Sequence, residues 1–298
     1  MPSPSPTLTS AYERCRRLNA RYGRSFYLAT LLLPAWKRRH VHALYGLTRY
    51  ADEIVDDLAA TAAVEDRARA LATFADEFFA ALDGAPTHDP LLPAVVHTVR
   101  AFDIDREIFE RFFRAMTMDL TVTAYETYDD TLSYMEGSAA VIGEMTLPIL
   151  EPLEPAAREP ARQLGFAFQL TNFVRDIGED LARGRVYLPA QDLARFGVTR
   201  DDLAAPRASA AVRSLLAFEI ARAREHYAAA EPGIDLLAPS SRPCVRTAHE
   251  LYGGILRQIE RADYEILRRR VAVPARTRLG LFARAHRAAA RAHRAELR

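Results

Sequence analysis

Apolar residues recur every three to four positions along most of this chain, which is the spacing of one buried face of an α-helix. No stretch shows sustained alternation of apolar and polar residues, and no strand–helix–strand rhythm is visible. The pattern predicts helices over residues 10–22, 35–59, 64–81, 90–102, 105–122, 131–150, 156–182, 201–204, 209–230 and 243–270. We therefore expect an all-α fold.

Short breaks separate these predicted helices, at residues 83–90, 124–130, 151–155, 184–197 and 231–242. Each break suits a connection inside one domain, so we expect a single domain over residues 1–298, with peripheral tails at 1–10 and from about 276 to 298. The second tail is rich in Arg and Ala. Its expected state is a solvated or frayed helix, and the alternative is a basic contact with acidic lipid headgroups.

The composition narrows the class of protein. Apolar residues make up 49% of the chain, and 40 basic against 39 acidic residues give a net charge of +1. These values exclude a disordered chain and argue against bulk electrostatic binding of nucleic acid. The two cysteines cannot form a disulfide framework, which indicates a reducing compartment. The first ten residues lack a signal-peptide pattern, and the longest apolar stretches are roughly ten residues, against about twenty for a membrane span. We expect a cytoplasmic protein that contacts the inner face of the membrane at most peripherally.

A polar stripe interrupts the apolar pattern of the second predicted helix. Tyr45, Arg49, Asp52 and Asp56 lie 0, 4, 7 and 11 positions along it, which places them within an arc of about 60°. A core-facing stripe at this spacing would carry apolar residues. This one carries a phenol, a guanidinium and two carboxylates.

A second polar stripe lies in the predicted helix over residues 156–182. Gln169, Asn172, Asp176 and Asp180 lie 0, 3, 7 and 11 positions along it, within an arc of about 80°. The residues around this stripe are apolar and look buried: Phe166, Phe168, Leu170, Phe173, Val174 and Ile177.

The paired carboxylates indicate a metal site. Two aspartates four residues apart on a helix point the same way, about 6 Å from one another. Mg²⁺ takes one or two carboxylates together with waters and phosphate oxygens, so two such pairs on facing helices predict a pocket for Mg²⁺ and a diphosphate, which leaves as a carbocation forms. Either pair alone would indicate only a solvent-exposed helix face; the metal site is predicted because both pairs occur together. A di-iron bundle is disfavoured because no histidine has Glu three residues before it.

Small residues gather between Gly137 and Gly143, just after Tyr134. Each Gly costs about 1 kcal/mol against Ala in a helix, so the cluster needs a reason. Either two helices pack closely here, or the wall of a cavity is kept low so that a bulky apolar ligand can lie along it.

Taken together, these strings resemble the squalene/phytoene synthase family of head-to-head (1′–1) isoprenoid coupling enzymes. The resemblance covers about residues 15–273. The matching strings are Gly23-Arg-Ser25-Phe26-Tyr, Leu33-Pro34, Ala43-Leu44-Tyr45, Arg49-Tyr-Ala-Asp52-Glu-Ile-Val-Asp56, Met118-Asp119-Leu120, Tyr134 with Gly137–Gly143, Gln169-Leu-Thr-Asn172-Phe-Val-Arg175-Asp176-Ile-Gly-Glu179-Asp180 and Gly184-Arg185-Val-Tyr187-Leu188-Pro189.

The resemblance implies an isoprenoid-synthase (terpenoid synthase) helical bundle with one central cavity. It implies four metal ligands, which are Asp52, Asp56, Asp176 and Asp180. It implies diphosphate or substrate contacts from Ser25, Phe26, Tyr45, Arg49, Gln169, Asn172, Arg175, Tyr187, Tyr252 and Arg270. It also places Tyr134 near the reacting carbons, with Ser138, Ala139 and Gly143 along the cavity wall.

Within the family, the strings around Asp52 and Tyr134 are most similar to bacterial phytoene synthases. The activity implied is the condensation of two geranylgeranyl diphosphates through prephytoene diphosphate to phytoene, in carotenoid biosynthesis, with Mg²⁺ or Mn²⁺ and without NADPH. The implied partners are polyprenyl diphosphates, and no nucleic acid is expected.

Several alternatives stay open. One is a squalene, dehydrosqualene or presqualene diphosphate synthase that uses farnesyl diphosphate. Another is a non-catalytic helical scaffold that binds isoprenoids. A head-to-tail prenyltransferase or terpene cyclase is disfavoured, because Asp56-Asp57 is followed by Leu-Ala-Ala rather than by the pattern Asp-Asp-x-x-Asp.

Overall fold

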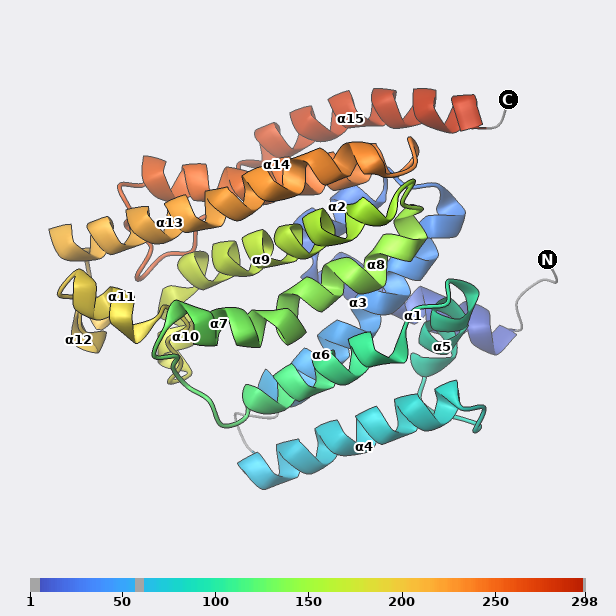
Figure 1. Ribbon diagram of the computed structural model, residues 1–298, viewed down its shortest axis with the longest axis horizontal. Helices are drawn as coiled ribbons and strands as arrows, with labels where there is room; N and C mark the ends of the chain where they lie inside the picture. The colour runs from blue at the N-terminus through green and yellow to red at the C-terminus, as the bar shows by residue number, and fades with distance from the viewer. Residues whose placement is uncertain (1–5, 57–61, 297–298) are drawn as a thin grey trace.

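The computed structural model describes residues 6–56 and 62–296 of the chain. These residues form helices joined by short connections, and the only β pairing among them is two isolated bridges, Ala124 with Val186 and Pro152 with Leu237. The all-α prediction is confirmed (Figure 1). Asp57 and the end of the helix expected over residues 35–59 lie outside the described residues.

The first half of the chain forms helices and one π-helical turn. They are α1 (Pro6–Tyr22), α2 (Arg24–Thr30), α3 (Ala35–Asp56), α4 (Val64–Leu82), α5 (Leu92–Ala101), α6 (Arg106–Met118), α7 (Tyr128–Met135), the π-helical turn η2 (Glu136–Ala140) and α8 (Val141–Leu150). The stretch expected as one helix over residues 131–150 is therefore divided by η2. Such single π turns inside helices are frequent at functional sites.

The second half begins with a 3₁₀ turn and continues through the remaining helices. They are η3 (Pro155–Ala157), α9 (Arg158–Arg175), α10 (Ile177–Ala182), α11 (Ala190–Arg195), α12 (Arg200–Ala204), α13 (Ala210–Ala230), η4 (Glu231–Leu236), α14 (Arg242–Arg261) and α15 (Ala275–Glu296). In Figure 1, α15 and α4 lie at opposite edges of the molecule.

Two of the predicted helices end earlier than the pattern suggested. The helix expected over residues 156–182 breaks at Asp176, whose φ of −103° and ψ of 11° close α9 before α10 begins. The helix expected over residues 243–270 ends at Arg261, because Asp263 and Tyr264 adopt positive φ angles of 53° and 60° that a right-handed helix does not allow.

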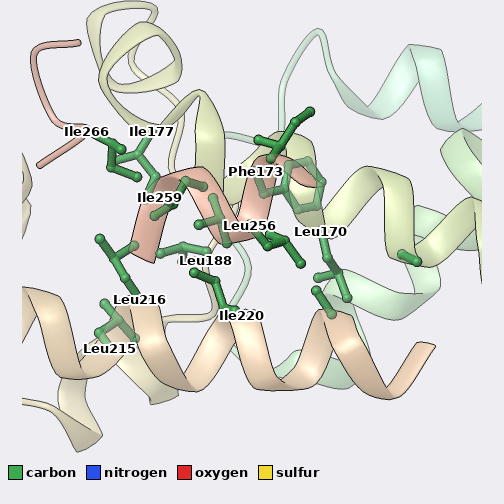
Figure 2. Close-up of a cluster of buried hydrophobic side chains, with 14 of the residues drawn as sticks. Leu170, Phe173, Ile177, Leu188, Leu215, Leu216, Ile220, Leu256, Ile259 and Ile266 are labelled. Carbon is green, nitrogen blue, oxygen red and sulfur yellow. The ribbon is translucent and has the colours of Figure 1, made fainter. Parts of the chain in front are cut away.

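Two apolar cores stabilise the bundle. One gathers side chains of α2 to α6 and α8, and the other gathers side chains of α7, α9, α13 and α14. Figure 2 shows part of the second core, where Phe173 and Ile177 approach Leu256 and Ile259 of α14. Phe168 on α9 packs against both cores. The two aspartate-bearing segments come from the two sides, so the polar residues meet at the seam between the cores.

Candidate active site

The first aspartate pair lies on α3. Its buried face carries Leu44, Leu47, Ala51, Ile54 and Val55, which fix the helix against the first core. Asp52 is partly exposed and accepts a hydrogen bond from Arg49 Nη1 at 2.6 Å, whereas the Asp56 side chain is mostly buried. Arg49 also donates to Glu53 at 3.2 Å, so it serves two carboxylates at once.

The second pair straddles the junction of α9 and α10. Asp176 receives bonds from Arg175 Nε at 2.7 Å and from Arg270 Nη2 at 3.1 Å. Although the helix breaks at Asp176, the N–H of Asp180 still donates to the carbonyl of Asp176 at 2.9 Å. The spacing of four residues therefore keeps its helical geometry across the break.

Two arginines that follow α10 bring the pairs together. Arg185 Nη1 donates to Asp56 Oδ1 at 2.7 Å, and Arg183 Nη1 lies 3.3 Å from Asp56 Oδ2. The side chains of Arg185 and Asp56 are only 11% and 15% exposed, so this ion pair is well shielded from solvent. These ion pairs place the segment that follows α10 against the first aspartate pair.

The electrostatics of the site favour binding of a cation. Burial raises the pKa of Asp52 to about 7, and the neighbouring Asp56 adds to this shift. Burial likewise raises the pKa of Asp180 to about 7, with Asp176 as the next cause. Asp180 has no arginine within ion-pair distance among the described residues. A carboxyl whose pKa is raised in this way gives up its proton more readily when a further positive charge, such as a metal ion, approaches it.

The residues present fit a magnesium–diphosphate group. Asn172 Oδ1 is buried and has no hydrogen-bond partner in the described part of the chain, while its amide nitrogen donates to Gln169 at 3.5 Å. An orphaned buried oxygen one helical turn before Asp176 suits a hard cation that prefers oxygen ligands. Within the described residues, no three acidic, histidine or cysteine side chains form a ready-made metal cage. Mg²⁺ commonly binds through one or two carboxylates and substrate phosphates, so no such cage is required.

Aromatic residues near the aspartates join four helices. Phe26 on α2 stacks on Tyr45 of α3, with ring centroids 5.8 Å apart. Tyr252 on α14 stacks on Phe168 of α9 at 4.3 Å. Burial raises the pKa of Tyr45 above its ordinary value, and the neighbouring Tyr252, a member of the second stack, adds to this shift. Ser25 is half-buried next to Phe26.

The small residues after Tyr134 serve close packing at two positions. A Cβ at Gly143 would lie 2.2 Å from the carbonyl oxygen of Ala161 on α9, and one at Gly137 would lie 2.6 Å from that of Arg111 on α6. The expectation that Gly143 lines a cavity is therefore corrected. The side of Gly143 on which a side chain would stand faces the backbone of α9. Ala139 is buried, and Ser138 Oγ is buried without a partner among the described residues.

Three polar residues that contact the predicted site residues were not themselves predicted to belong to the site. Asp119, Arg183 and Arg185 belong to it through hydrogen bonds and ion pairs with Tyr134, Tyr187 and Asp56. Asp119 and Arg185 stand inside strings that resemble the family. One feature of the sequence could have indicated a role for Asp119: it is a carboxylate between two apolar residues, Met118 and Leu120, at the end of an amphipathic helix.

The sequence matches known proteins over most of its length. Residues 19–277 match the family model for squalene/phytoene synthase. The chain is 36% identical to a phytoene synthase of Arthrospira platensis over 281 residues, which is 90% of each protein. It is 37% identical to a 15-cis-phytoene synthase of Synechocystis sp., over 92% of this chain and 86% of the relative.

Solved structures show the same architecture. A dehydrosqualene synthase aligns with a TM-score of 0.86 at 26% identity, over 93% of this chain and 96% of that one. A squalene synthase from Alicyclobacillus acidocaldarius aligns with a TM-score of 0.78 at 30% identity, over 87% and 96%. The expected isoprenoid-synthase fold is confirmed.

Proposed function

The chain belongs to the squalene/phytoene synthase family and is a prenyltransferase, and from that premise we propose that it couples two geranylgeranyl diphosphates head to head to give phytoene, with Mg²⁺ as cofactor. The observation that carries the proposal is the pairing of Arg183 and Arg185, which follow the second aspartate pair along the chain, with Asp56 of the first pair. The choice of a C20 substrate is supported by relatives named phytoene synthases.

The chain's own residues would bind and orient the diphosphate. Five guanidiniums surround the four aspartates: Arg49, Arg175, Arg183, Arg185 and Arg270. Each now pairs with a carboxylate and can exchange a carboxylate oxygen for a phosphate oxygen in the same fork geometry. When bound, Mg²⁺ supplies further positive charge that stabilises the departing diphosphate.

The proposed reaction balances without a reductant. The first C–O bond breaks with its electron pair going to diphosphate, the double bond of the second molecule attacks the cation, and loss of a proton closes a cyclopropane. The second C–O bond then breaks, the cation rearranges, and a second proton leaves to form the central double bond. The overall products are one hydrocarbon, two diphosphates and two protons. Squalene formation would also need a hydride, which is why NADPH separates the alternatives.

A single incubation tests the proposal. Purified protein with Mg²⁺ receives either geranylgeranyl or farnesyl diphosphate, with and without NADPH, and the hydrocarbons are read by mass. We expect a C40 product from the C20 substrate, equal in amount with and without NADPH. A C30 product or a cyclopropyl diphosphate from the C15 substrate alone would move the chain to the squalene side, which the similar solved structures favour. No product from either would favour the scaffold.

We also propose that α15 contacts an anionic membrane surface. None of the described helices is long and apolar enough to cross a membrane. One face of α15 packs on the bundle through Leu281, Phe282, Ala285 and Ala289. The outward face carries a row of exposed arginines, which are Arg276, Arg284, Arg287 and Arg291.

This arginine face has the charge that acidic lipids attract. Its four members fall within an arc of about 80° on the helix. Ion pairs of the described residues involve none of them. Leu279, beside this row, is 64% exposed. A basic helix with an exposed apolar residue is typical of peripheral binding to anionic lipid.

A further inference from the structure

Asp119 is a buried carboxylate that has no role in the coupling reaction as proposed above. It closes the C-terminus of α6 and is 8% exposed. The Tyr134 hydroxyl donates to its Oδ2 at 2.7 Å, and the Tyr187 hydroxyl donates to its Oδ1 at 3.1 Å. Each carboxylate oxygen therefore holds one phenol in a fixed orientation.

The two phenols belong to a wall of aromatic rings. Tyr187 stacks on Phe173 with centroids 4.4 Å apart and planes 7° apart, and the centroids of Tyr134 and Tyr187 lie 5.9 Å apart. Tyr125 flanks Tyr134 at 5.3 Å. The face of an aromatic ring attracts cations, so the orientation of these rings decides what a nearby carbocation meets.

Arg185 connects this wall to the first aspartate pair. Its Nη2 donates to the backbone oxygen of Asp119 at 2.9 Å, while its Nη1 binds Asp56. The wall therefore lies one side chain away from the site proposed for diphosphate. A cation left behind by a departing diphosphate would form next to these rings.

Packing alone does not explain this arrangement. Burying an ionisable group costs more than burying an apolar residue of similar size, so a fold that needed only a filled core would be more stable without the carboxylate. Burial raises the pKa of Asp119 to about 6, and the two phenol bonds oppose that shift. The carboxylate is thus ionised in neutral solution, where its bonds to the phenols are charge-assisted.

We propose that Asp119 is a positioning residue for the coupling reaction: by accepting hydrogen bonds from the hydroxyls of Tyr134 and Tyr187, it fixes the orientation of the two rings beside the site proposed for diphosphate. This inference rests on the proposed function. Misplacing a group by about 1 Å can lower a rate by roughly 100-fold, so the effect should appear in kcat. Substrate binding through the diphosphate should change little, because the Asp119 carboxylate binds the hydroxyls of Tyr134 and Tyr187.

The test compares Asp119→Asn, Asp119→Ala and Tyr187→Phe with the wild type, using Mg²⁺ and geranylgeranyl diphosphate. The matched control is Asp192→Asn, which alters another buried carboxylate, paired with Arg222 away from the site. For each protein, kcat, KM, melting temperature and the ratio of cyclopropyl diphosphate to hydrocarbon are measured.

We expect Asp119→Asn to lower kcat by roughly 10- to 100-fold with KM within about threefold, and Asp119→Ala to lower it further. Asp192→Asn should lower the melting temperature but not kcat. If Asp119→Asn fails to fold, Tyr187→Phe must lower kcat at unchanged KM. Unchanged kcat in the folded variants, or losses that only follow the melting temperature as in the control, would overturn the inference. An inactive wild type would instead refute the proposed function.

Discussion

Asp56 on α3 and Arg185 beyond α10 are 129 positions apart in the chain, yet their side chains lie 2.7 Å apart. Because both side chains are nearly buried, removing Asp56 would leave the charge of Arg185 without this partner, at a cost of about 3–5 kcal/mol. The pair therefore fixes the distance between the two halves of the site. It also shows that the charge of Asp56 is balanced by arginines of the other half.

Replacing one aspartate of either pair should disable turnover. We expect Asp52→Asn and Asp176→Asn each to lower the rate by at least roughly 100-fold, because each removes one preorganised charge from the diphosphate site. Product formation from geranylgeranyl diphosphate measures the effect. Asp235→Asn is the control, since that carboxylate is 68% exposed and pairs only with Arg246 at the surface. Turnover equal to that of the wild type in both site variants would favour the scaffold alternative.

Gly143→Ala should destabilise the fold without changing chain-length preference. The added methyl would meet the backbone of α9, and overpacking of this kind costs about 1–3 kcal/mol. The melting temperature should fall by several degrees, and rates with C20 and C15 substrates should fall together. Gly280→Ala is the control, because nothing lies within 4 Å of its Cβ position. A loss confined to the C20 substrate would return Gly143 to the cavity wall.

The sequence was sufficient for the fold class and for the two aspartate pairs. Both rest on helical periodicity, which is a local property. The break at Asp176 was not predictable in this way, because a tertiary contact accompanies it. A Cβ at Gly178 would lie 2.2 Å from the carbonyl oxygen of Leu267, so α10 approaches a distant segment that the local pattern does not reveal.

The arginine partners of Asp56 were equally hidden from the sequence. Arg183 and Arg185 look like ordinary charged residues of a connection, and only the fold brings them to Asp56. The same holds for Gly143, since periodicity cannot decide whether a small residue faces a ligand or another helix. Long-range contacts, not local propensity, assign these residues.

Removing arginines from α15 should weaken binding to anionic vesicles. Each basic residue near such a surface contributes about 1 kcal/mol, so Arg284/Arg287/Arg291→Gln should lower partitioning roughly 100-fold. Cosedimentation with phosphatidylcholine vesicles, with and without phosphatidylserine, measures this. The control is Arg17/Arg69/Arg246→Gln, which removes three arginines that already pair with acids. Equal binding to both kinds of vesicle would contradict the proposed contact.

The raised pKa values of Asp52 and Asp180 predict how stability depends on pH. Each has a folded value of about 7 against an ordinary value of 3.8. The folded protein therefore holds protons that the unfolded chain releases, and the resulting stabilisation is lost as the pH rises through 7. Asn resembles the protonated form. In metal-free protein, the melting temperature of Asp52→Asn/Asp180→Asn should exceed that of the wild type by a small margin at about pH 5 and by a larger margin at about pH 8.

The difference between the two melting curves is the informative quantity. Burial lowers the pKa values of His40 and His42, so these histidines make stability rise with pH below about 6.5 in both proteins and cancel in the difference. Added Mg²⁺ with diphosphate should reverse the order near pH 8, because only the wild type offers it two ionised carboxylates. A variant that gains as much from Mg²⁺ as the wild type would exclude Asp52 and Asp180 as ligands. A difference independent of pH would show that neither carboxyl retains its proton on folding.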